Sequence, residues 1–428
     1  MAGWVSLKSF NKFCEVIYLT VDKIKEIFEG GVNVSKQRLI DFGRRGLEHF
    51  QNGTQDRVDQ IFQVPADNYT SAEKWELEMK NVFRRLPLVL SCSSELSNPG
   101  SYHSLEVLGV PVLVTRGEDG VIRAFLNSCT HRGAIVVPEG TGTSRRHACP
   151  YHAWTYNSQG DLVGVYEEEH FGQIDYQCNG LVELPCDERA GLIWVTLSTN
   201  PVIDIDTFLC GYGEMLEYLG LADCHVVGRQ VIEGPNWKVA YDGYLDLYHL
   251  PILHRNTFGP EGGGHAVYDS WGPHQRATRP DVYFSKLEGR DENDWLISEL
   301  VGGVWTIFPH VSIAGFDANG KIYMLSQLFP GSTPESSKTI QTFLHTQPPD
   351  EQQADVVKKQ MDFLRVVVED EDYFTGIRLQ KALNTGMKEF VHFGLNEGGG
   401  QRFHQFLEKM LNTTDDEVPT FFKESSDK

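Results

Sequence analysis

Cys-Thr-His-Arg-Gly at residues 129–133 and Cys-Pro-Tyr-His at residues 149–152 are the stretches that indicate the fold most directly. Each motif offers one thiolate and one imidazole, and each falls where a tight turn is expected. Gly133 permits unusual backbone angles beside the first pair, and Pro150 stiffens the second. Two Cys and two His at this spacing predict a metal centre held between two loops, rather than four unconnected residues of a β-sheet core.

Two kinds of metal centre are compatible with these residues. One is a tetrahedral zinc site, which would make the region a zinc-stabilised binding module. The other is a Rieske [2Fe-2S] centre, in which one iron takes two Cys and the other takes two His. A zinc finger places both Cys together and both His together, whereas here each loop carries one of each. This segregation favours two loops that clamp a binuclear cluster.

The residues around the two motifs are rich in β-branched side chains, with turn signals between the runs. Gly-Glu-Asp-Gly at residues 117–120 lies between two such runs and predicts a β-hairpin. We therefore expect an all-β domain over residues 86–198. Residues 1–85 have helical spacing and are expected to pack on a catalytic domain formed by residues 199–428, where helices and strands mix. The expected fold class is α+β.

Residues 236–254 carry a second group of ligand-type side chains, Asp246, His249 and His254. The two His lie about 140° apart on a regular helix, so one metal could bind both only if the helix ended between them. Pro251 predicts such an end, and Asp246 lies three residues before His249 on the same face. A buried His beside a surface His is the alternative. Two His and one carboxylate are the arrangement typical of non-haem Fe(II).

With both constellations, the chain resembles the catalytic alpha subunits of Rieske-type ring-hydroxylating oxygenases. The motif CTHRG…CPYHAW and the run Asp-x2-His-x4-His after Asn-Trp-Lys carry the resemblance, which extends from about Tyr69 to the late helix. It implies a [2Fe-2S] cluster with Cys129 and Cys149 on one iron and His131 and His152 on the other. It also implies a mononuclear Fe(II) bound by His249 and His254 in a helix-grip, START-like antiparallel sheet flanked by helices. One departure is Asp242-Gly243, where the family often has Glu-Asn.

The third ligand of the mononuclear iron must come from elsewhere in the chain. The family has an acidic pair followed by a Gln on a late helix, and the segment 368–380 resembles that pattern. Asp372, eight residues before Gln380, is the better match, and Asp370 is the alternative. A run of four acids is also typical of a solvated helix face.

The resemblance implies O2-dependent hydroxylation of an organic substrate, with an aromatic substrate and ring dihydroxylation favoured. The alternatives are a monooxygenase or demethylase acting on N- or O-methyl groups, and a Rieske electron carrier without oxygenase activity. The family forms head-to-tail trimers, alone or as alpha–beta pairs, in which Asp246 would bridge His249 and a cluster His of the neighbour. No G-x-G-x-x-G fingerprint follows a strand, so a separate NAD(P)H-dependent reductase, and possibly a ferredoxin, would supply electrons.

Composition narrows the function classes further. The chain has 428 residues and a formal net charge of −21, which argues against binding nucleic acid or anionic lipid through bulk charge. No run approaches the length of a membrane helix, and the N-terminus lacks a convincing signal peptide, so a cytoplasmic location is expected.

The remaining Cys and His are not assigned to a site. The other six Cys are interpreted as buried, and four His as surface or loop residues, namely His147, His170, His265 and His274. Four apolar or aromatic residues fit the lining of an apolar pocket and a hydrophobic core equally well: Leu245, Phe258, Trp305 and Phe308.

Overall fold

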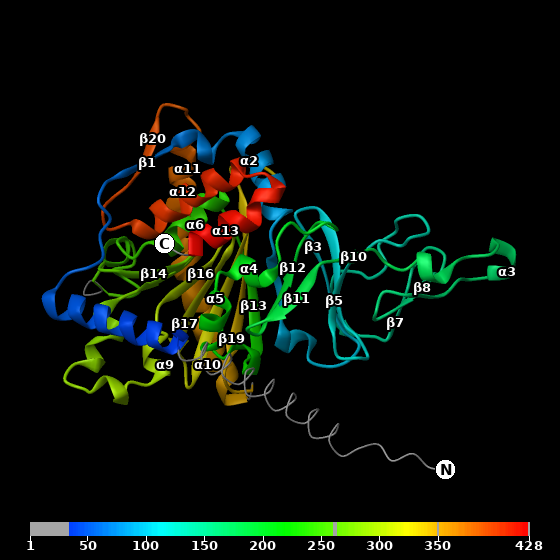
Figure 1. Cartoon of the computed structure of the whole chain (residues 1–428), viewed down its shortest axis with the longest axis horizontal. Coiled ribbons are helices and arrows are strands. Elements are labelled where there is room, and N and C mark those ends of the chain that lie inside the picture. Colours follow the sequence, from blue (N-terminus) through cyan, green and yellow to red (C-terminus); the bar gives the residue numbers. More distant parts are fainter. Residues whose placement is uncertain (1–33, 260–262, 349–350, 427–428) are drawn as a thin grey trace, which may run out of the picture.

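Figure 1 shows the computed structural model of the chain, which describes residues 34–259, 263–348 and 351–426. A helix-flanked sheet forms one body, and a smaller β body extends from it with its far tip at β7, β8 and α3. The mixed α+β class is confirmed. Of the described residues, no helix has the length and hydropathy to cross a membrane.

The smaller body is built from three antiparallel sheets, with strand orders β10-β5-β4-β3-β6, β11-β12-β2 and β7-β8-β9. The predicted hairpin at residues 117–120 joins β4 to β5 and is confirmed, with Arg116 opposite Ile122. The strands are β2 Leu88–Cys92, β3 Ser101–Val107, β4 Val110–Arg116, β5 Ile122–Leu126, β6 Gly140–Thr143, β7 Arg146–Ala148, β8 Thr155–Asn157, β9 Leu162–Gly164, β10 Glu183–Leu184, β11 Cys186–Arg189 and β12 Leu192–Val195.

The larger body contains a seven-stranded antiparallel sheet of order β13-β19-β18-β17-β16-β15-β14. One face is covered by α6, α11, α12 and α13, which lie together above it in Figure 1. The strands are β13 His225–Gly234, β14 Val267–Trp271, β15 His274–Thr278, β16 Val304–Ile307, β17 Val311–Asp317, β18 Lys321–Pro330 and β19 Ser337–His345. The principal helices are α4 Ile205–Leu209, α5 Tyr212–Glu217, α6 Trp237–Leu245, α7 Leu250–Leu253, α10 Glu351–Arg365, α11 Phe374–Leu383, α12 Gly398–Asn412 and α13 Val418–Ser426.

The sequence predicted helical spacing throughout residues 1–85, but the N-terminal segment also contains a strand. Residues 34–52 are helical, and α2 (Ala72–Glu78) is preceded by its N-cap Ser71, whose hydroxyl accepts from the N–H of Lys74. Between them lies β1 (Phe62–Pro65), which pairs with β20 (Phe390–Phe393). A four-residue strand whose partner lies so far along the chain leaves no local periodicity to detect. Residues 1–33, for which helical spacing was also predicted, lie outside the described residues.

Two of the histidines interpreted as surface or loop residues are buried in strands. His274 lies in β15 with no exposed surface, and its Nε2 is 2.8 Å from the carbonyl of Phe208. Burial lowers the pKa of His274 to about 4, so this imidazole is neutral. His147 is buried in β7. The interpretation of the remaining Cys as buried is also wrong for Cys178, which is exposed.

A buried ion pair ties α2 to α6. Lys238 Nζ lies 2.5 Å from Glu78 Oε1, and both side chains are almost fully buried. The indole N–H of Trp237 donates to the other Glu78 oxygen at 2.7 Å. Removing one partner of such a pair leaves an uncompensated charge in the core.

Glu78→Gln should therefore lower the free energy of unfolding of the larger body by about 3–5 kcal/mol, because the Lys238 ammonium loses its counter-charge. Denaturant unfolding followed by tryptophan fluorescence measures the change. Arg44→Gln, which breaks the exposed ion pair with Glu292, is the matched control and should cost less than about 1 kcal/mol. Equal effects of the two variants would contradict this account.

Candidate metal centres

Two loops of matching geometry carry the first four candidate ligands. Residues 127–139 connect β5 to β6, and residues 149–154 connect β7 to β8. In each loop the Cys N–H donates to a carbonyl five residues on, and the Cys carbonyl accepts from the N–H four residues on. These bonds, each 2.8 or 2.9 Å, join Cys129 to Ala134 and Gly133, and Cys149 to Trp154 and Ala153. The repeated turn presents one Cys and one His from each loop.

The loops bring the four side chains together. The rings of His131 and His152 lie 4.8 Å apart between centroids. Cys129 and Cys149 are buried, and their side chains are within hydrogen-bonding reach of each other. Trp154 stacks on His131 with a centroid distance of 5.0 Å and an interplanar angle of 12°. The predicted grouping of the four residues is therefore present, with the two Cys together and the two His together.

This donor set fits a Rieske cluster. Nδ1 of His152 is buried and has no hydrogen-bond partner in the described part of the chain, as expected for a nitrogen that binds a metal. The Tyr156 hydroxyl lies 3.2 Å from Cys129 Sγ. Burial, together with the hydrogen bond to Cys129, raises the pKa of Tyr156 to about 12, so this hydroxyl stays protonated. A hydroxyl at this place can donate to a ligating thiolate and stabilise its charge.

The second constellation lies at the two ends of one short helix. α6 ends at Leu245, and Asp246 follows in an extended conformation, where its Oδ1 accepts from the N–H groups of Tyr248 and His249. α7 lies between His249 and His254 and carries Pro251 in its first turn, where a missing N–H is harmless. The prediction that Pro251 ends the preceding helix is therefore wrong, since the break comes earlier, at Asp246.

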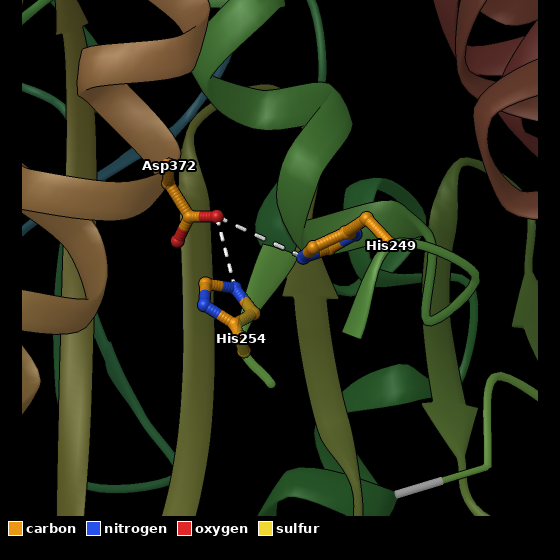
Figure 2. Close-up of side chains that lie close together, drawn as sticks. All are labelled: His249, His254 and Asp372. Carbon is orange, nitrogen blue, oxygen red and sulfur yellow. Dashed lines mark ion pairs between the residues drawn. The ribbon is translucent and has the colours of Figure 1, made fainter. Parts of the chain in front are cut away.

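His249, His254 and Asp372 converge on one point (Figure 2). Oδ1 of Asp372 lies 3.0 Å from Nε2 of His254 and 3.7 Å from Nε2 of His249. The three ligand-type atoms lie within 4.8 Å of one another, as a metal ion would require. His254 is buried, whereas His249 and Asp372 are partly exposed, so the group has a closed side and an open side.

A π-helix places Asp372. The late helix is continuous, but Val366–Tyr373 within it form π turns between α10 and α11. The wider π turn directs Asp372 toward the two imidazoles, whereas Asp370 is exposed. Of the two candidates left open by the sequence, the structure thus brings Asp372 to the histidines.

Two further carboxylates lie behind the imidazoles. Asp246 Oδ2 is 3.0 Å from Nδ1 of His249, and Glu371 Oε2 is 2.7 Å from Nδ1 of His254. A carboxylate can only accept, so both Nδ1 atoms donate, and both Nε2 atoms face Asp372. Burial lowers the pKa of His249 and of His254, but the neighbouring carboxylates outweigh it and raise both values.

The charge of the site fits a divalent cation. Asp246, Glu371 and Asp372 form ion pairs with the two histidines alone, and no Lys or Arg among the described residues lies within ion-pair distance of them. Three carboxylates that share only two imidazoles are costly to hold together unless a cation is bound. Two His and one carboxylate with an open side form the ligand set typical of non-haem Fe(II).

A cavity of about 290 Å³ opens beside this group. It is lined by His249, His254 and Asp372, and otherwise mainly by apolar and aromatic side chains, including Phe258, Phe316 and Met324. Of the four residues interpreted as pocket or core, only Phe258 lines this cavity. Leu245, Trp305 and Phe308 belong to the main hydrophobic core.

Glu371 was not singled out from the sequence, because it is one of the four acids attributed to a solvated face. Its neighbour Asp372 is detectable by family pattern, but the contact of Glu371 with His254 depends on the π turn. Asp242 also has a defined place: it accepts from the Tyr69 hydroxyl at 2.9 Å and lies 2.9 Å from Nε2 of His404. It thus joins α6 to the N-terminal segment and to α12.

Comparisons with known proteins agree with this architecture. Residues 87–175 match the family model for the Rieske [2Fe-2S] domain, and residues 221–413 match that for the ring hydroxylating alpha subunit, catalytic domain. The carnitine monooxygenase oxygenase subunit of Acinetobacter baumannii is 32% identical over 46% of this chain and 53% of its own length. That of Escherichia coli K12 is 27% identical over 81% and 93%. The alpha subunit of benzene 1,2-dioxygenase of Pseudomonas putida is 33% identical over 42% of each.

Among solved structures, the apo form of the quaternary ammonium Rieske monooxygenase CntA superimposes with a TM-score of 0.67 at 23% identity, covering 82% of this chain and 96% of that one. The match to the first relative spans about half of that protein's length. The chain belongs to the Rieske-type ring-hydroxylating oxygenases, as an alpha subunit. Its two domains imply a Rieske [2Fe-2S] cluster and a mononuclear iron.

Cys129→Ala should remove the cluster and leave the mononuclear iron, because Cys129 lies in a small core separate from the main one. Acid-labile sulfide and the EPR signal of the reduced protein should both be lost, while about one iron per chain remains. The exposed Cys178→Ala variant is the control and should keep the sulfide content of the unmodified protein. Retention of sulfide in the Cys129 variant would contradict this ligand assignment.

Asp372→Ala should lower the iron content from about three to about two atoms per chain while sparing the cluster signal. Metal analysis together with EPR separates the two centres. Asp370→Ala, two residues away and exposed, is the matched control and should keep all of the iron. The reverse pattern would move the ligand to Asp370.

Proposed function

We propose that the protein is an O2-dependent oxygenase that oxidises an organic substrate at the mononuclear site, using electrons stored at the cluster site. The observation that carries the proposal is the presence, in one chain, of the paired loops holding Cys129, His131, Cys149 and His152, and of the open group formed by His249, His254 and Asp372. An electron carrier would need only the first of these. A zinc module would need neither the open group nor its cavity.

The residues of the chain position and tune both sites. When bound, the cluster supplies single electrons and the Fe(II) supplies O2 activation. Asp246 and Glu371 hold the two imidazoles in the tautomer that leaves each Nε2 free as a ligand. The apolar walls around Phe258, Phe316 and Met324 exclude water and hold the substrate beside the open side of the group.

We propose that electrons pass between the two sites across a contact with a neighbouring subunit. In one chain the loop between β7 and β8 lies by the far tip of the smaller body, away from α6 (Figure 1). Exposed apolar side chains surround each site, with Tyr151 and Phe171 near the cluster and Tyr248 and Ile252 near His249. We therefore propose a head-to-tail ring in which the Asp246 side chain contacts the neighbour's cluster loops. A separate reductase, with or without a ferredoxin, would supply the electrons.

Two candidate reactions differ in the type of oxygenation, one being monooxygenation and the other ring dihydroxylation. Monooxygenation of a substrate bearing an N- or O-methyl group is supported by the carnitine monooxygenase subunits, one of which matches nearly its full length. Ring dihydroxylation, which the sequence alone favoured, is supported by the benzene dioxygenase subunit over a shorter part of the chain. The relatives include both kinds of enzyme, but the carnitine monooxygenase match covers more of this chain than the benzene dioxygenase match. Methyl-group oxidation is therefore the first reaction to test.

A direct test supplies the iron-loaded protein with NADH, a surrogate reductase and panels of aromatic and of N- or O-methylated compounds. Oxygen uptake should be coupled to a product, either a dihydrodiol or formaldehyde with the demethylated compound, as resolved by mass spectrometry. Oxygen uptake without product would indicate a wrong panel. Fully loaded protein whose reduced cluster is not reoxidised by O2 under any condition would contradict oxygenase activity.

Asp246→Asn should keep both metals but slow the reoxidation of the reduced cluster by at least about tenfold, because the amide cannot provide the negative charge behind His249. Stopped-flow absorbance of the cluster in the presence of O2 and substrate measures this rate. Asn retains the oxygen that accepts from the N–H groups of Tyr248 and His249, so the local fold should be kept. Normal reoxidation in this variant would exclude a role for Asp246 in electron transfer.

A further inference from the structure

A cavity of about 490 Å³ lies along the outer edge of β14, the last strand of the seven-stranded sheet. Four arginines line it, against two carboxylates in the described part of its wall. They are Arg38 and Arg45 of the helix over residues 34–52, Arg57 of the segment after it and Arg402 of α12, with Asp56 and Asp269 as the acids. The wall therefore has a formal charge of +2, although the whole chain carries −21.

Both carboxylates of this cavity already have partners. Asp269 accepts from Arg38 through both of its oxygens, at 2.7 and 3.2 Å. Asp56 accepts from the N–H of Tyr268 at 2.8 Å, and its Oδ2 lies 3.5 Å from the guanidinium of Arg45. Two of the four arginines are thus neutralised within the chain, and the positive charge that remains belongs to the other two.

Arg57 and Arg402 have no such partner. Among the described residues, neither guanidinium takes part in a hydrogen bond or an ion pair. Arg402 is partly buried, and burial lowers its pKa although the charge of Asp269 opposes the shift. Arg402 follows Gly398 by one turn of α12, and a Cβ at Gly398 would lie 3.1 Å from Cγ1 of Val58, the neighbour of Arg57. The two arginines therefore come from adjacent pieces of backbone.

The chemistry of this wall selects an anion. A guanidinium that is partly withdrawn from water and lacks a counter-charge is stabilised by an anion from outside, and its planar fork of N–H donors matches a carboxylate or a phosphate. Two unpaired forks favour a dianion over a monoanion. Val58 and Leu395 are the only aliphatic side chains in the described lining, so an apolar ligand would gain little there.

We propose that this cavity binds a small dianion, either a phosphate monoester or a dicarboxylate, whose charge pairs with Arg57 and Arg402. The volume of the cavity is that of a site for a small molecule. None of its lining residues lines the cavity beside His249, His254 and Asp372. The dianion is therefore a second ligand, separate from the substrate that is oxidised at the iron site.

Calorimetric titration of the iron-loaded protein at pH 8 and constant ionic strength tests this proposal with three probes: methyl phosphate, succinate and acetate. One of the two dianions should bind at one site per chain, at least about tenfold more tightly than acetate, as expected for one additional charge-assisted pair. The dianion that binds more tightly identifies the class of ligand.

Arg402→Gln and Arg57→Gln should each weaken binding of that dianion by about tenfold, because each removes one unpaired fork. Arg57 is exposed and without a hydrogen bond among the described residues, so its replacement should leave the fold intact. Arg378→Gln, which removes an exposed arginine of α11 outside the cavity, is the matched control and should bind as the unmodified protein does.

Three results would overturn the proposal at once: no saturable binding of either dianion below about 10 mM, acetate bound as tightly, or unchanged affinity in both arginine variants. Dianion binding that is lost in Asp372→Ala but kept in Arg402→Gln would place the anion on the iron instead. A smaller assembly of Arg402→Gln in gel filtration would show that an acidic side chain of a neighbouring copy fills the cavity, and would also contradict a free ligand.

Discussion

The arrangement of the iron site depends on two carboxylates that stand behind two imidazoles. Asp246 and Glu371 each accept from an Nδ1–H, and this fixes the direction of both Nε2 atoms toward Asp372. Without such acceptors a histidine ring can rotate or exchange tautomers, and the lone pairs would not share one point. The three acids also leave the group strongly negative, which a bound cation relieves. Ligand geometry and metal affinity thus come from the same contacts.

Each of these contacts is made by an irregular piece of backbone. Asp246 leaves α6 in an extended conformation and caps the next turn, so His249 and His254 end on the two sides of α7. Asp372 and Glu371 lie in π turns, where two adjacent acids can reach the two nitrogens of one His254 ring. Regular helices would separate these side chains. The strands and helices on either side are regular, and they hold the irregular segments in place.

The sequence was sufficient where the chemistry lies in short, local motifs. The sequence was enough to predict the loops of Cys129 and Cys149, the hairpin at residues 117–120 and the α+β class. The prediction failed where a contact depends on distant residues or on helix type. β1 pairs with a strand over three hundred residues away, and the helix break lies at Asp246 rather than at Pro251. Nothing in the sequence distinguished Glu371 from its three acidic neighbours, because its contact with His254 depends on the π turns.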